Sequence, residues 1–226
     1  GYRQIDINLG CPFPMIAGKH KGAGMLLYPA QVAEVLAPIA EYPEIQFSLK
    51  MRLGWENASE CMVLVELLNA LRLSRIALHA RTGKQQYKGH PDLEAFQGFY
   101  ELCQHPLYYN GGIESLSDIR QILIRFPLLK GVFIGRGLLS SPLLAKEFKG
   151  NETFLPEQRM SIYFAFHEEL FSAYSQVLQG ETQLLVKMKI LWEYFLPETD
   201  RKLLKRIKKS TRLQQYTESV KAIFTS

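Results

Sequence analysis

The chain has 226 residues and a net charge of +5; 47% of the residues are hydrophobic and 22% are charged. These values are ordinary for a soluble globular protein of one sizeable domain or two small ones. No apolar run approaches the roughly 18 residues that a membrane-spanning helix needs, and no signal peptide is visible, so no membrane partner is expected. Three widely spaced cysteines indicate a reducing compartment, the cytoplasm, and no metal-site spacing is present.

From residue 1 to about residue 148, strand-like and helix-like segments alternate. The expected strands are short and rich in Ile, Val, Leu, Phe and Tyr: Gln4–Leu9, Gln46–Arg52, Arg75–His79, Leu107–Asn110 and Gly131–Gly135. The expected helices lie between and after them: Pro29–Glu41, Ala58–Leu71, Asp92–Cys103, Ser117–Arg125 and Ser141–Phe148. This alternation predicts an α/β fold with a parallel sheet, helical crossovers and strands covered on both faces.

After Gly150 the strand signal nearly disappears. Amphipathic patterns predict helices at Ser161–Leu178, Gln183–Phe195, Thr199–Lys209 and Gln214–Phe224. We therefore expect a first domain over residues 1–150 and an all-helical second domain over residues 151–226.

Polar or glycine residues follow each expected strand. They occur at Asn8–Pro12, Lys50–Trp55, His79–Gly83, Asn110–Ile113 and Gly135–Gly137. In (β/α) barrels this edge of the sheet carries the active site. The last two segments are glycine-rich loops before helices, where backbone N–H groups suit a phosphate, and Arg136 would add a charged contact.

Each of these features also has a purely structural interpretation. Cys11 is either a small apolar filler at a turn or a reactive thiol held over a ligand. His79 alone is more often a satisfied polar residue than a catalytic one, and Gly111-Gly112 alone is more often a simple turn. Cys61 and Cys103 are expected in the core. The set of five strand ends together favours a ligand-binding site.

Several motifs occur in a recognisable order: DINLGCP at residues 6–12, KGAGMLL at 21–27, KMRLGW at 50–55, HART at 79–82 with YKG at 87–89, NGGI at 110–113 and IGRG at 134–137. Together they resemble the tRNA-dihydrouridine synthase family over residues 1–148, and more weakly in the helical tail. The resemblance implies a TIM (β/α)8-type barrel. The first motif matches the family's fourth strand, so only about the last five β/α units are expected here.

The resemblance also implies a function. It predicts an enzyme that reduces a uridine in tRNA to 5,6-dihydrouridine, with FMN as cofactor, NADPH as electron donor and Cys11 as general acid. By the same resemblance, FMN is bound by Lys50, His79, Asn110, Gly111, Gly112, Gly135 and Arg136. The target uridine is bound by Asn8, Arg52 and Arg81. At Gly112 the sequence departs from the family, which usually carries an acidic residue there.

The tail is strongly basic between Arg201 and Arg212, with seven basic residues and no acidic one. Several of them would share one helix face, and Lys205, Arg206, Lys208 and Lys209 are expected to bind RNA phosphates. The alternative is a solvated surface.

Two other functions stay open. One is another FMN barrel oxidoreductase such as dihydroorotate dehydrogenase, whose active-site loop also resembles Asn-x-x-Cys-Pro. The other is a truncated, non-catalytic tRNA-binding relative. A sheet of five strands has two open edges, which makes self-association through these edges possible.

Overall fold

A computed structural model describes residues 1–225 and divides the chain into two compact units. The first unit contains Gly1–Ile113 and Ser117–Ile134, and the second contains Glu114–Leu116 and Gly135–Ser226. Ser226, the last residue of the predicted helical domain, lies outside the described residues.

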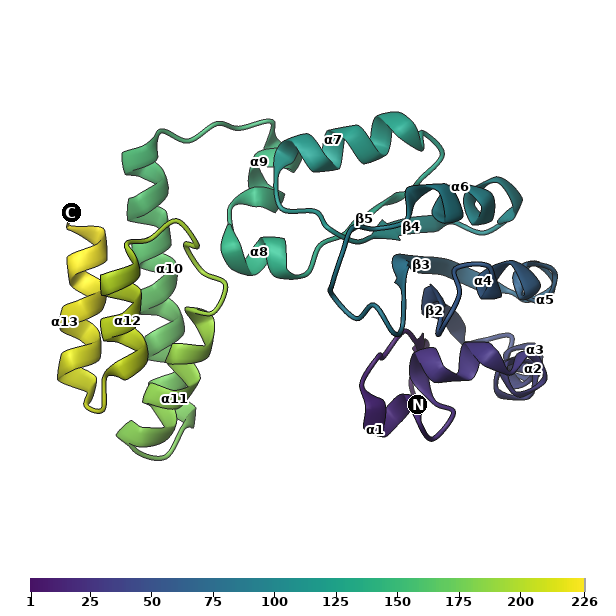
Figure 1. The fold of residues 1–226 in the computed structure, drawn as a ribbon, viewed down its shortest axis with the longest axis horizontal. Coiled ribbons are helices and arrows are strands. Elements are labelled where there is room, and N and C mark those ends of the chain that lie inside the picture. The colour runs from purple at the N-terminus through teal and green to yellow at the C-terminus, as the bar shows by residue number, and fades with distance from the viewer. Residues whose placement is uncertain (226) are drawn as a thin grey trace. The chain divides into compact units, whose positions relative to one another are not determined.

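The first unit contains a five-stranded parallel sheet whose strands follow chain order (Figure 1). The strands are β1 (Gln4–Leu9), β2 (Gln46–Gly54), β3 (Leu73–Thr82), β4 (Leu107–Asn110) and β5 (Gly131–Phe133). This confirms the predicted α/β class and parallel sheet. The structure extends β2 and β3 and shortens β5 relative to the prediction, since strand ends depend on pairing with neighbours and local composition does not specify them.

Short helices connect these strands. They are α1 (Pro14–Ala17), the 3-10 helix η1 (Gly22–Leu27), α2 (Pro29–Leu36), α3 (Pro38–Glu41), α4 (Glu60–Val63), α5 (Val65–Asn69), α6 (Leu93–Leu102) and α7 (Leu116–Arg125). The single helix predicted over residues 29–41 is wrong, because Pro38 has no N–H to continue α2 and instead begins α3. Asp92 caps α6 by accepting a hydrogen bond from Ala95 N at 2.9 Å.

The two faces of the sheet differ in chemistry. One face carries buried apolar side chains, among them Leu49, Met51, Ile76 and Leu78, and α4 and α6 contact β2 and β3. The register places polar side chains in common rows on the opposite face: Asp6, Asn8, Ser48, Lys50, Arg52, Arg75, His79, Arg81, Tyr108 and Asn110. The expectation of strands covered on both faces is wrong for β1, where Gln4, Asp6 and Asn8 are exposed, whereas Ser48, Arg52 and His79 on the same face of β2 and β3 are buried.

The described elements of the second unit from Arg136 onward are all helices. They are α8 (Arg136–Ser140), α9 (Leu144–Gly150), α10 (Pro156–Val177), α11 (Glu181–Leu191), α12 (Arg201–Lys209) and α13 (Leu213–Phe224). Their core includes Tyr163, Met188, Trp192, Ile207 and Tyr216, all of them buried.

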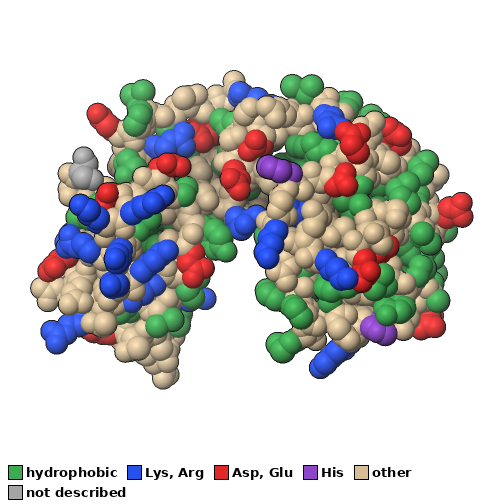
Figure 2. All heavy atoms as spheres, viewed as in Figure 1, with side chains coloured by type: hydrophobic (Ala, Val, Ile, Leu, Met, Phe, Trp, Pro, Cys, Tyr) green, Lys and Arg blue, Asp and Glu red, His purple; other side chains and the backbone are tan. Residues whose placement is uncertain are grey.

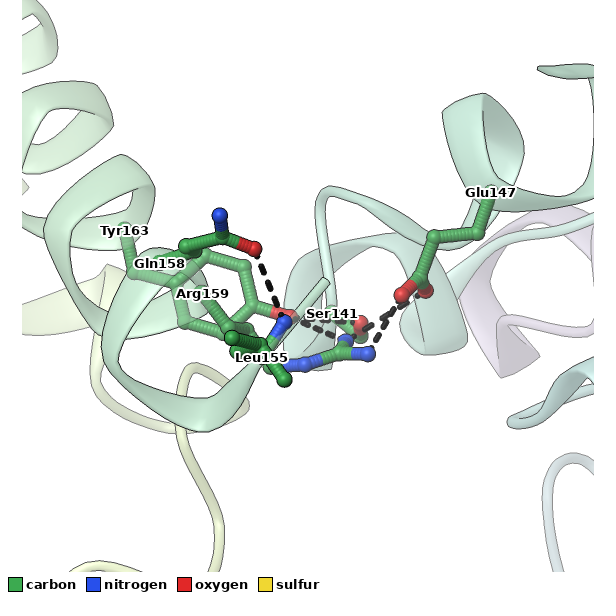
Figure 3. A network of polar contacts seen from close by, with 6 residues as sticks. All are labelled: Ser141, Glu147, Leu155, Gln158, Arg159 and Tyr163. Carbon is green, nitrogen blue, oxygen red and sulfur yellow. Dashed lines mark hydrogen bonds and ion pairs between the residues drawn. The ribbon is translucent and has the colours of Figure 1, made fainter. Parts of the chain in front are cut away.

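A polar network explains why the units divide at Ile134 and Gly135 and not near the expected residue 150 (Figure 3). Ser141 Oγ and Tyr163 OH share a hydrogen bond of 2.7 Å, and Arg159 donates to the same hydroxyl at 3.2 Å. Arg159 also forms an ion pair with Glu147 of α9, whose carboxylate is only 3% exposed. These contacts tie the segment of α8 and α9 to α10.

Candidate functional site

The carboxyl ends of the strands bring most of the predicted site residues of the first unit into neighbouring positions. Asn8 pairs with Lys50, and Arg52 pairs with His79, which in turn pairs with Asn110. Registered residues of parallel strands share a face, and residues two apart on one strand do as well. Lys50 and Arg52 therefore lie on the same polar face, which is the face opposite the helix-covered core.

The turn that carries Cys11 is held from both sides. Asn8 Oδ1 accepts a hydrogen bond from Gly10 N at 2.9 Å, and the carbonyl of Cys11 accepts one from Ala23 N at 3.0 Å. A Cβ atom on Gly22 would stand 2.9 Å from Cys11 Cβ, and Gly22 has a φ of +57°. Only glycine fits this close approach in a left-handed conformation. The Cys11 thiol is consequently half-buried at a fixed place beside β1.

Arg52 joins the loops that follow β1 and β3. Its side chain is 1% exposed and donates to three carbonyl oxygens, those of Gly10 at 3.0 Å, Thr82 at 2.8 Å and Gln86 at 2.8 Å. Burial lowers the pKa of Arg52 from its ordinary value, and these carbonyl dipoles compensate the buried charge. The geometry therefore gives Arg52 a role in loop positioning. Its predicted role in substrate binding stays a prediction.

Lys50 differs from Arg52 in its partners. Its side chain is half-buried, and within the described residues no hydrogen bond or ion pair holds its ammonium group. Burial lowers the pKa of Lys50, the positive charge of Arg52 lowers it further, and Asp6 opposes both effects. A partly desolvated ammonium of this kind favours an acceptor atom supplied by a ligand.

His79 and Arg81 form a buried pair on β3. Arg81 Nη1 lies 3.2 Å from His79 Nε2, and Arg81 Nη2 donates to the carbonyl of Gly89 at 2.9 Å. Because a guanidinium can only donate, His79 accepts at Nε2 and its neutral ring carries the proton at Nδ1. On β4, Asn110 Nδ2 donates to the carbonyl of Phe133 at 2.8 Å.

Sequence reasoning missed Tyr87 in this region. Its half-exposed ring lies 5.6 Å from the guanidinium of Arg52 and 6.4 Å from the ring of His79. The YKG motif that contains Tyr87 supported the resemblance to the family. It gave no reason to place the ring among the site residues, because that placement depends on how the loop after β3 folds back.

The glycine-rich loops fall in different units. Gly111 and Gly112 follow β4 with φ values of +140° and +59°, and a Cβ on Gly112 would lie 3.0 Å from Pro91 Cγ. Gly135 and Arg136 begin α8 in the second unit, where a Cβ on Gly135 would meet open space. The left-handed backbone conformation at Gly112 favours glycine. At Gly135 a Cβ atom would meet no neighbouring atom, so space alone does not require glycine there.

In the second unit, cations gather on one face of α12. Lys202, Lys205, Arg206 and Lys209 line a groove of about 540 Å³ together with Ser210, Gln215, Glu218 and Ser219. Lys208 does not line it. No ion pair is formed by the cations of α12 with any described residue. Figure 2 shows Lys and Arg side chains gathered over the region of α12 and α13.

The groove thus contains three of the four predicted RNA-binding residues, Lys205, Arg206 and Lys209, and adds Lys202. The spacing i, i+3, i+4 and i+7 from Lys202 to Lys209 is the sequence signal that identifies this face.

Two other properties of the described residues bear on chemistry. No group of three His, Cys, Asp or Glu side chains among residues 1–225 is arranged to hold a metal ion, and none of the described helices is long and apolar enough to cross a membrane. The three cysteines are free. Burial raises the pKa of Cys61 to about 12, so this thiol is an unreactive core residue, whereas the half-buried Cys11 lies at the candidate site.

Comparison with known proteins identifies the family of the chain. Residues 1–225 match the model of the dihydrouridine synthase (Dus) family, and the chain therefore belongs to this family. It is 32% identical over 139 residues to a probable tRNA-dihydrouridine synthase of Rhizobium leguminosarum bv. phaseoli, covering 61% of this chain and 44% of the relative.

Two further relatives extend this comparison. A probable tRNA-dihydrouridine synthase of Aquifex aeolicus is 36% identical over 149 residues, covering 64% of this chain and 46% of the relative. The tRNA-dihydrouridine synthase B of Vibrio vulnificus is 27% identical over 161 residues, covering 70% and 50%. The chain spans about half the length of the curated relatives that it matches.

Proposed function

We propose that this chain is part of a tRNA-dihydrouridine synthase that reduces a uridine in tRNA to 5,6-dihydrouridine with FMN and NADPH. The parallel sheet would then form part of a TIM (β/α)8 barrel, with its polar face turned to the barrel interior. The observation that carries the proposal is the half-buried Lys50 ammonium, which no described residue binds, on the same sheet face as the strand end that leads into the Cys11 turn. Membership of the dihydrouridine synthase family weighs against the alternative of a dihydroorotate dehydrogenase.

The residues of the first unit suit a flavin. Lys50 offers a positive charge for the N1–O2 edge of the isoalloxazine ring, where the reduced anion carries its charge. His79 and Asn110 supply polar side chains at the adjacent strand ends, and Gly111 and Gly112 follow with a backbone conformation that favours glycine. Gly135 and Arg136 enter the proposal as phosphate-binding residues through the family resemblance alone.

FMN held by Lys50, His79 and Asn110 would supply the hydride that C6 of the uracil ring takes up, with NADPH as the source of the electrons. The Cys11 thiol gives its proton to C5, so that the C5–C6 double bond becomes a single bond and the thiolate is reprotonated from solvent. Asn8 holds the turn with its Oδ1, which leaves its Nδ2 to donate to a uracil carbonyl. Arg52 keeps the Cys11 turn in place through the carbonyl of Gly10, and Arg81 orients His79.

The substitution Cys11→Ala tests the proposed general acid. We expect it to leave the affinities for FMN and for unmodified tRNA unchanged while slowing dihydrouridine formation by about 10²- to 10⁴-fold, the usual contribution of a positioned acid. Cys103→Ala is the matched control, because Cys103 is also free and half-buried but lies at the end of α6. Nucleoside analysis of the reacted tRNA measures turnover, and flavin absorbance measures FMN binding.

Undiminished turnover in the Cys11→Ala variant would contradict the acid role. If the unsubstituted chain binds tRNA but retains no protein-bound flavin after FMN is added, the proposal of catalysis by this chain fails. A non-catalytic tRNA-binding protein is then favoured. Reduction of free orotate would favour the dihydroorotate dehydrogenase alternative.

A further inference from the structure

The segment between Cys11 and α2 exposes basic and aromatic side chains that the proposed chemistry does not use. Lys19, His20 and Lys21 are exposed, and Tyr28 retains 36% of its accessible surface. No acidic residue occurs from residue 7 to residue 33. Within the described residues neither lysine forms an ion pair. We call Lys19, His20, Lys21 and Tyr28 the His20 platform.

The platform combines a stacked ring pair with a strained backbone residue. The rings of His20 and Tyr28 are stacked, with centroids 4.1 Å apart and an angle of 24° between their planes. His20 has a φ of +53°, which is uncommon for a residue with a Cβ. Backbone hydrogen bonds hold it there, from Lys19 N to Ile16 O at 3.1 Å and from His20 N to Ala17 O at 3.0 Å. Strain that is held in this way at an exposed position often accompanies function.

The platform is directly connected to the Cys11 turn. Gly22, the residue after Lys21, approaches Cys11 so closely that a Cβ would lie 2.7 Å from the Cys11 carbonyl oxygen, and Ala23 N donates to that oxygen at 3.0 Å. The position of Lys21 is therefore fixed relative to the proposed general acid by one residue of backbone.

We propose that the His20 platform binds the tRNA strand next to the nucleotide that is presented to Cys11, with Lys19 and Lys21 on phosphates and the stacked His20–Tyr28 pair against a base. This inference rests on the proposed function. A uridine that reaches Cys11 brings its flanking phosphates with it, since they are covalently attached. Two unpaired lysines and an exposed ring pair are the elements of single-strand RNA recognition.

The phosphates of NADPH offer the same chemistry to two lysines. RNA is favoured because its flanking phosphates must lie near the Cys11 turn during reaction, whereas NADPH has no covalent link to the uridine. The experiment below separates the two ligands.

The test compares variants of the whole 226-residue chain in their binding to unmodified tRNA. For Lys19→Ala/Lys21→Ala we expect about tenfold weaker binding, and a slope of log K against log salt that is smaller by about 1.4, as for two lost single-strand phosphate contacts. His20→Gly keeps the positive φ without strain but removes the ring, and we expect about fivefold weaker binding from lost stacking. FMN affinity stays unchanged in both.

The control is Arg120→Ala/Lys130→Ala, which removes two exposed cations of the same unit that lie outside the platform; its tRNA affinity stays as in the unsubstituted chain. Unchanged tRNA affinity and salt slope in the platform variants overturn the inference alone. The inference is also overturned if the platform variants bind tRNA as the unsubstituted chain does and only their affinity for NADPH falls. A chain that binds no tRNA at all overturns both the inference and the proposed function. If the unsubstituted chain binds tRNA but forms no dihydrouridine, and the platform variants bind tRNA more weakly, the result supports the platform and contradicts only the proposed catalysis.

Discussion

At the scale of single residues, His167 shows how a buried hydrogen-bond chain sets a protonation state. Its side chain is 1% exposed in the core of the second unit. Because a carboxylate can only accept, the proton of the neutral ring lies on Nδ1, 3.0 Å from Glu168 Oε1. Nε2 then accepts from Tyr216 OH at 2.7 Å, and that hydroxyl accepts from Trp192 Nε1 at 3.0 Å. Protonation at Nε2 would break the hydrogen bond that this nitrogen accepts from Tyr216.

We therefore expect acid to destabilise the chain through His167. Burial lowers the pKa of His167 below its ordinary value of 6.5, and Glu168 opposes that shift only in part. The unfolded chain then binds the proton more readily than the folded one, so this contribution to stability is complete above pH 6.5 and is lost as the pH falls below it. Urea unfolding between pH 5 and pH 7.5 measures the effect.

The variant His167→Gln provides the comparison for that measurement. It is expected to be less stable at pH 7.5 but to lose less of its free energy of unfolding between pH 7.5 and pH 5 than the unsubstituted chain does. His105→Gln is the control, because His105 in the other unit donates a single hydrogen bond from Nε2 to the carbonyl of Leu68 at 2.7 Å. Equal pH dependence in the His167→Gln variant and the unsubstituted chain would contradict the assignment.

At the scale of elements, we expect the cations of α12 to contribute unequally to RNA affinity. Lys205, Arg206 and Lys209 line the groove and Lys208 does not. For Lys205→Ala/Arg206→Ala/Lys209→Ala we expect the slope of log K against log salt for tRNA to fall by about 2.1 to 2.7, since each of the three lost phosphate contacts removes about 0.7 to 0.9. Asp200, which caps α12 through Lys202 N and Leu203 N, stays in place, so the helix itself is retained.

Lys208→Ala is the matched control on the same helix. It is expected to change the salt slope by less than any single groove substitution. If Lys208→Ala lowers the slope as much as the groove substitutions do, the cations act through their total charge, and the face that the groove defines has no special role.

At the scale of the whole molecule, we expect from the polar face of the sheet that the 226-residue chain binds FMN and that Lys50 contributes to this binding. A charge-assisted hydrogen bond is worth about 1.5–3 kcal/mol, so Lys50→Gln is expected to weaken FMN binding by at least tenfold. Lys84→Gln is the control, because Lys84 is exposed and pairs with Glu56. Titration of FMN absorbance measures the dissociation constant of each variant. Equal dissociation constants for Lys50→Gln and the unsubstituted chain would remove Lys50 from the proposed flavin site.

The ends of the sheet also matter at this scale. β1 and β5 are its terminal strands, each paired on one side only, and β1 is mostly exposed. Self-association through these edges stays a prediction. The same two edges are where further strands would continue a barrel, and the chain spans about half the length of its matched relatives.

The sequence by itself determined the family, the five strands in their order, and the helical character of the segments that follow residue 150. Short runs rich in Ile, Val, Leu, Phe and Tyr predicted all five strands, and two of them, Gln4–Leu9 and Leu107–Asn110, have the predicted bounds. Periodicity located the helices of the tail to within a few residues, as for Gln214–Phe224 against Leu213–Phe224. These features could be predicted because they depend on local pattern, and the family motifs because they are contiguous in the chain.

Only the tertiary structure decided what each side chain contacts. It separated Lys50, which no described residue binds, from Arg52, which three backbone carbonyls hold, although both stand in one motif. It also placed Tyr87 beside Arg52, grouped Lys202 and not Lys208 with the α12 groove, and joined α8 and α9 to the helical unit. The physical reason is that these partners come from loops and helices distant in sequence, whose approach is fixed by packing and register and has no local signature.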